Sequence, residues 1–139
     1  MSPIRYGLWL LGQVSGGFLV AWPFTLAAVA ALIWSLWSVP PALRNRFYRV
    51  LLLSVSVYGL AFWLVFLGVV LEIPSRAPRV EVPRVFIASA LACLIVALLI
   101  VGYAGRRLRL RAAGALTLPL WFAYWCYFVA GMSVTGDWM

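Results

Sequence analysis

Aromatic side chains are the most conspicuous chemical groups in this 139-residue sequence. Six of the eight positions from Trp121 to Phe128 are aromatic. Such rings stack on a flat apolar ligand or pack against neighbouring helices, and packing is the more common role. We take four of them as candidate ligand-binding residues, for a lipid, quinone, carotenoid or chlorophyll: Trp121, Tyr124, Trp125 and Phe128. Nothing in the sequence requires a cofactor.

Residues that support acid–base, metal or redox chemistry are scarce. The sequence has no His, and its only acids are Glu72, Glu81 and Asp137, which are far apart. We therefore expect no metal site and no catalytic residues, so that the protein is not an enzyme. Cys93 and Cys126 fall at similar expected depths, about 12 and 9 Å from one edge of their apolar segments. A disulfide between them is conceivable, but two buried free thiols are the expected state.

Four long segments lack Asp, Glu, Lys, Arg and His, and each is 20 to 22 residues long. They are Phe18–Val39, Val50–Leu71, Val85–Ala104 and Ala112–Met132. About 20 apolar residues in a helix cross the roughly 30 Å hydrocarbon core of a bilayer. Hydrophobic residues make up 66% of the chain and charged residues 10%, which excludes an ordinary soluble domain. The sequence predicts an all-α membrane protein, with one four-span domain over residues 1–139.

The connections predict how these spans are arranged. Residues 40–49 and 105–111 form short loops, so spans one and two, and spans three and four, are expected to pack as antiparallel hairpins. Three prolines in residues 72–83 predict an extended connector. Before the first span, residues 3–12 are expected to form an interfacial helix, with a turn in the glycine-rich residues 12–17. One long helix through those glycines is the alternative.

Two local features predict details of the helices. Pro119 removes a backbone donor inside the fourth span, which predicts a kink at this residue. The carbonyl of Ala115 is then left without its partner, and Thr117 is near enough to satisfy it.

Small residues predict close helix contacts. They include Ala27, Ala28, Ala31, Ser56, Gly59, Gly68, Ala88, Ser89, Ala92 and Cys93.

Arginine supplies every basic charge, eleven in all, and the net charge is +8. The arginines lie near the ends of apolar segments, where they meet anionic lipid head groups, so we expect membrane lipid and not nucleic acid as their partner. Seven are candidate head-group ligands: Arg44, Arg46, Arg49, Arg106, Arg107, Arg109 and Arg111. These seven lie in loops one and three, on one side of the membrane, whereas four arginines lie on the opposite side. Positive loops are retained in the cytoplasm, which predicts both termini outside. The composition indicates a bacterial cytoplasmic membrane.

Function is predicted mainly by what the spans lack. With no charge at membrane depth and no soluble domain, we expect a non-catalytic accessory subunit of a larger bacterial membrane complex, of respiratory, photosynthetic or transport type, packed against other integral-membrane subunits. One alternative is a homo-oligomeric channel or transporter lined by polar residues of the spans, with Glu72 as its only membrane acid. Its lining would be Ser54, Ser56, Tyr58, Thr117 and Tyr124. The other is a membrane-perturbing effector of a toxin or defence system.

Overall fold

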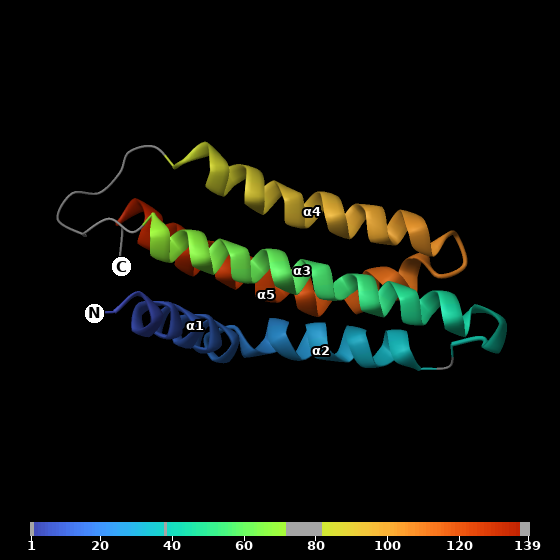
Figure 1. Ribbon diagram of the computed structural model, residues 1–139. Helices are drawn as coiled ribbons and strands as arrows, with labels where there is room; N and C mark the ends of the chain where they lie inside the picture. Colours follow the sequence, from blue (N-terminus) through green and yellow to red (C-terminus); the bar gives the residue numbers. More distant parts are fainter. Residues whose placement is uncertain (1, 38, 72–81, 137–139) are drawn as a thin grey trace.

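The computed structural model describes residues 2–37, 39–71 and 82–136, and this part of the chain is entirely helical outside short connections. The predicted all-α fold is confirmed. The described residues form five α-helices and one short 3₁₀ helix, η1. In chain order they are α1 (Pro3–Val20), α2 (Trp22–Leu36), η1 (Pro41–Leu43), α3 (Arg44–Val70), α4 (Arg84–Ala104) and α5 (Arg109–Thr135). The α-helices are labelled in Figure 1.

Three of the helices, α3, α4 and α5, are each long and apolar enough to cross a membrane. They contain the predicted second, third and fourth spans. α3 and α5 begin several residues before their apolar segments and include arginines. A charge-free segment shows which residues suit the hydrocarbon core, but it does not show where a helix ends. α1 and α2 pass the same test only as a pair, so the described residues hold three spans, or four if the pair is one broken span.

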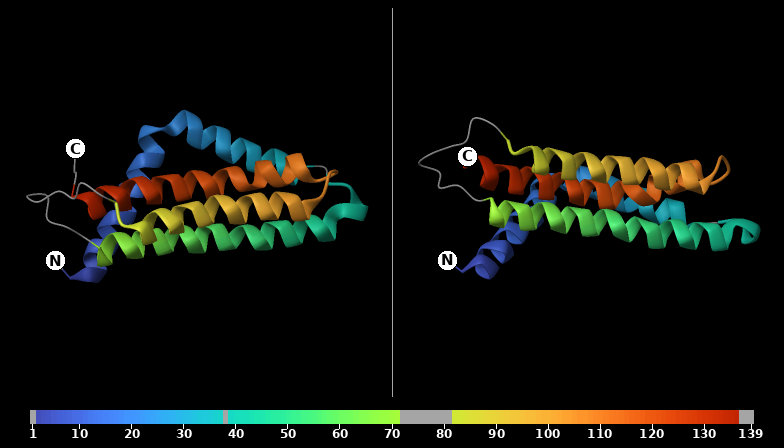
Figure 2. Two further views of the ribbon diagram at one scale, coloured as in Figure 1. Left: turned by 90° about the horizontal axis from the view of Figure 1, so that it is seen from above. Right: turned by 45° about the horizontal axis from the view of Figure 1, so that its top comes forward.

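The first predicted span is not one straight helix. α1 continues through Gly12 and Gly17 to Val20, and the chain then bends by 89° before α2. We call this bend, Leu19–Phe24, the corner; it is clearest in the left view of Figure 2. The turn predicted in residues 12–17 is not found, because the helix that begins at Pro3 continues through these glycines, as in the alternative prediction, and ends at Val20. The interfacial position of residues 3–12 stays a prediction. The bend comes just before Pro23, which has no N–H and suits only the first turn of a new helix.

α5 is the central helix of the bundle. It packs against each of the other four α-helices, whereas α4 packs only on α3 and α5 within the described chain. α2 packs on α5 and α1 but not on α3, so the predicted pairing of the first and second spans is not found among the described residues. α4 and α5 do form the predicted antiparallel hairpin (Figure 1). The predicted extended connector, residues 72–83, lies almost wholly outside the described residues.

α3 and α5 approach each other closely at Gly68. A Cβ at this position would lie 2.9 Å from the Cβ of Ala130, so only glycine fits. Beside it, the buried Ser133 hydroxyl donates a hydrogen bond to the Gly68 carbonyl at 2.7 Å. Since that bond uses the serine proton, the Tyr6 hydroxyl donates to Ser133 Oγ, also at 2.7 Å, which joins α1 to the same point. The contact predicted at Gly68 is confirmed.

The other predicted contacts have mixed outcomes. Ala28 and Cys93 are buried, as expected for close helix packing. Gly59 is exposed, and a Cβ added there would meet no other atom of the described chain within 4 Å, so the contact predicted at this residue is not one between helices of the described chain. Ser56 is exposed as well. Sequence identified the small residues but not the side of each helix that faces a neighbour.

Candidate functional site

The four predicted ligand residues lie together on α5 and stack mainly on one another. The Trp121 and Tyr124 rings are 5.5 Å apart and nearly parallel, and the Tyr124 and Phe128 rings are 6.5 Å apart with 17° between their planes. Trp125 meets all three edge-on. Tyr124 is still 51% exposed, so part of its ring remains accessible to a ligand. The role of these four residues in binding stays a prediction.

Trp121 also connects α5 to the corner. Its indole Nε1 donates a hydrogen bond to Thr25 Oγ1 at 3.0 Å, and Thr25 Oγ1 donates in turn to the Phe18 carbonyl at 2.9 Å. The Phe18 carbonyl lies in the last turn of α1, where it has no partner within the helix. The Thr25 hydroxyl thus bridges the break between α1 and α2. Thr25 was missed from the sequence, although its position two residues after Pro23 was the available signal.

Trp125 fills the space left by a glycine on α1. A side chain on Gly17 would overlap the Trp125 ring, so the glycine allows α1 to lie directly on this ring. The Trp125 Nε1 atom is buried and has no hydrogen-bond partner among the described residues. Of the glycines in residues 12–17, Gly17 therefore serves packing, whereas a Cβ at Gly12 or Gly16 would meet no atom of the described chain within 4 Å.

Two grooves run along α5. The groove between α2 and α5 has a volume of about 490 Å³. Its lining residues are Phe24, Ala27, Ala28, Ala113, Thr117, Leu120, Trp121 and Tyr124. A second groove of about 320 Å³ lies between α4 and α5, beside Cys93 and Tyr127. Leu120 and Tyr124 line both grooves, so α5 forms a low ridge between them, flanked by α2 and α4 (Figure 2, left).

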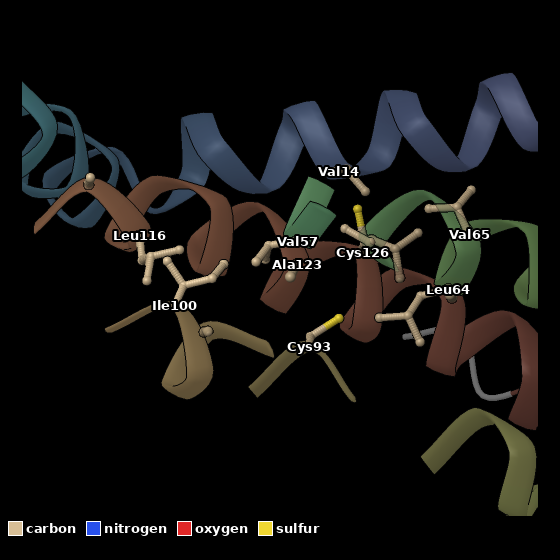
Figure 3. Close-up of a cluster of buried hydrophobic side chains, with 14 of the residues drawn as sticks. Val14, Val57, Leu64, Val65, Cys93, Ile100, Leu116, Ala123 and Cys126 are labelled. Carbon is tan, nitrogen blue, oxygen red and sulfur yellow. The ribbon is translucent and has the colours of Figure 1, made fainter. Parts of the chain in front are cut away.

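The two cysteines are both buried and free, as expected. Figure 3 shows the Cys126 sulfur pointing toward Val14 and the Cys93 sulfur pointing toward Leu64. Both thiols belong to the same buried cluster of apolar side chains.

The seven predicted head-group arginines lie in the first turns of α3, in the α4–α5 turn and at the start of α5, all at one end of the bundle (Figure 1). Arg111 has a structural role. Its Nη1 atom donates to the carbonyls of Ser35 and Trp37, and its guanidinium lies 5.7 Å from the Trp34 ring centre. These carbonyls end α2, so Arg111 caps that helix from α5. Lipid binding by all seven stays a prediction.

The remaining charges give no evidence of a second site. Arg5 and Arg84 lie at the opposite end of the bundle, and Arg76 and Arg79 lie outside the described residues. Glu72, Glu81 and Asp137 are outside the described residues too. Within the part of the chain that the structure describes, no group of three or more His, Cys, Asp or Glu side chains lies close enough together to bind a metal.

No family model matches this chain, and no curated protein or solved structure does either. Function is therefore argued from geometry alone.

Two polar residues of the predicted conduit, Thr117 and Tyr124, line the groove between α2 and α5. Ser54 is buried and Ser56 is exposed, although both lie on α3. Each donates its hydroxyl to the carbonyl three residues before it in the same helix. Thr117 likewise bonds to the Ala113 carbonyl of its own helix, and not to Ala115 as predicted. A conduit lined by these five residues stays a prediction.

Proposed function

We propose that this protein is a non-catalytic accessory subunit of a larger integral-membrane complex in a bacterial cytoplasmic membrane. The observation that carries the proposal is the exposed corner between α1 and α2. The seven arginines at one end of the bundle support an orientation with that end in the cytoplasm and both termini outside. Labelling a cysteine placed at Ser2, but not one at Arg44, with an impermeant maleimide added outside would test that orientation.

The corner lies level with the middle of the bundle. Thr25 bonds to Trp121, which is 12 residues, or about 18 Å, along an α5 helix about 40 Å long. If α3, α4 and α5 cross the membrane, the corner is therefore at hydrocarbon depth. Its side chains face outward: Leu19 is 77% exposed, Val20 83% and Trp22 60%.

The backbone at a helix break at this depth must be shielded from the lipid. Hydrocarbon provides no hydrogen bonds, so irregular backbone inside a membrane is stable only where protein or a polar cavity surrounds it. Hydrogen bonds from Ala21 and Thr25 satisfy the carbonyls of Gly17, Phe18 and Ala21. The first turn of α2 has further backbone donors with no partner inside that helix. The exposed apolar side chains around these groups support a protein partner that covers the corner.

A homo-oligomeric transporter is the second candidate, because many transporters contain helices broken near the middle of the membrane. In that case a second copy of this chain would cover the corner. The described helices contain no acidic residue to couple transport to protons, which favours the accessory role.

Photocrosslinking at the corner would distinguish these functions. We expect a benzoylphenylalanine placed at Val20 to give a heterotypic adduct in native membranes. The same group at Leu98, a 71% exposed residue of α4, is the matched control and is expected to label mainly lipid. If the only adducts have twice the 15.4 kDa mass of the chain, the result would favour the homo-oligomer. A monodisperse single chain with no adduct at either position would contradict both functions.

A further inference from the structure

We infer that the groove between α2 and α5 binds one acyl chain of an anionic phospholipid, whose phosphate contacts Arg109. The groove is a defined hollow of about 490 Å³, within the range of small-molecule sites. The groove shares Phe24 with the corner, whereas Leu19 and Val20 are not among its lining residues. A partner protein that covers Leu19 and Val20 would therefore leave the arginine end of the groove open.

The lining of the groove suits hydrocarbon. Ala27, Ala28 and Ala113 create the hollow because their side chains end at Cβ. Two polar groups of the lining are already paired: the Thr117 hydroxyl donates to the Ala113 carbonyl at 3.0 Å, and the Trp121 indole donates to Thr25. An occupant therefore meets mainly apolar surface. A chain-like ligand fits this surface better than a flat one, since the lining extends along α5 from Ala113 to Tyr124.

The length of the groove matches one leaflet. Its lining on α5 extends over 11 residues from Ala113 to Tyr124, which is about 16 Å. Half of a roughly 30 Å hydrocarbon core is about 15 Å. An acyl chain that starts at the arginine end would thus extend to the level of Tyr124, near the middle of the membrane.

The charge at the mouth of the groove selects the head group. Arg109 is one helical turn before Ala113, so it lies on the same side of α5 as the groove. Arg111 is already engaged with the end of α2. No acidic residue occurs in residues 2–71 or 82–136, so no carboxylate of the described chain pairs with Arg109. A lipid phosphate with a net negative head group supplies the missing partner.

Photolabelling with lipids tests this inference. The protein is placed in vesicles that contain phosphatidylglycerol with a diazirine on one acyl chain, and adducts are mapped on peptides from α2 and α5. Phosphatidylcholine with the same chain is the comparison lipid. We expect more adducts in the groove from phosphatidylglycerol. Arg109→Gln should lower these about five-fold, because one arginine at a membrane surface has about that effect on binding of an anionic lipid. Ala27→Phe should remove them by filling the hollow.

Matched variants separate the site from general effects. Ala30→Phe adds the same ring to an exposed position of α2, and Arg84→Gln removes the same charge from the opposite end of the bundle. Both are expected to label like the original protein. Equal labelling by the two lipids, or an equal loss in Arg84→Gln and Arg109→Gln, would overturn the inference. If Ala27→Phe fails to fold, as judged by circular dichroism, the comparison of Arg109→Gln with Arg84→Gln tests the inference.

Discussion

The α3–α5 pair and the α1–α2 pair are held to the bundle in different ways. α3 has nine buried residues, and its contact with α5 is close enough at Gly68 to exclude a side chain. α2 has only two buried residues and packs, within the described chain, on no helix other than α1 and α5. The first pair is therefore stabilised along its whole length. The second is attached through α5, chiefly by the Trp121–Thr25 bond, the Trp125 ring against Gly17, the close approach of Gly114 to α2 and the Arg111 cap.

This difference shows how membrane helices associate when hydrophobicity does not drive them together. In lipid, close packing and hydrogen bonds between helices supply most of the attraction. α3 and α5 use both at Gly68 and Ser133. α2 uses polar contacts at its two ends, with Ala28 buried between them. We therefore expect α3–α5 to form a core that stays folded when the α1–α2 pair is detached.

The largest effect is expected from Gly68→Leu. The new side chain would meet the Ala130 backbone as well as its Cβ, so α3 and α5 would have to separate. We expect a loss of about 3 kcal/mol in the free energy of unfolding, measured by SDS titration in mixed micelles. Gly59→Leu is the control, since open space surrounds that position, and it should change stability little. Equal effects of the two variants would contradict the proposed core.

Gly17→Leu should have a smaller and more local effect. The added side chain would displace α1 from the Trp125 ring and weaken the attachment of α1. We expect a loss of about 2 kcal/mol. Limited proteolysis should then cut within residues 3–36 while α3, α4 and α5 remain protected. Gly12→Leu, which has no neighbour within 4 Å, serves as the control. Simultaneous loss of protection in α3 would show that the two regions are one cooperative unit.

Arg111→Gln should have the smallest effect, confined to the end of α2. Without the guanidinium, the carbonyls of Ser35 and Trp37 lose their partner. We expect about 1 kcal/mol of local destabilisation, seen as faster hydrogen exchange in the last turn of α2. Arg107→Gln removes a charge from the nearby turn and should leave this exchange unchanged. Slower or unaltered exchange in the Arg111 variant would mean that the cap does not hold α2.

The sequence predicted the uninterrupted helices well and the broken one poorly. The apolar segments 50–71, 85–104 and 112–132 all lie in helices of the expected order, because length and apolarity determine these spans directly. Residues 18–39 have the same hydropathy, and hydropathy carries no information about the direction of the backbone. The available signal was Pro23, which cannot continue a helix from α1.

The candidate site was predicted in part. The aromatic residues of α5 do lie together, because positions three and four apart share one side of a helix. Their mutual stacking, and the groove beside Trp121, depend on where α2 packs against α5, which no local pattern specifies. The same holds for Arg111: its charge suggested lipid, whereas its contact with Trp37 depends on tertiary structure.

The cap between α2 and α5 also has a consequence for biosynthesis. Ser35 and Arg111 are 76 residues apart, so at about 5–20 residues per second the ribosome completes α2 some 4 to 15 s before it adds its cap. α3 and α4 are made in that interval, and neither packs on α2. The newly inserted α1–α2 pair therefore lacks its main packing partner for this interval. During that time, insertion factors or other chains have access to the surface that α5 later covers.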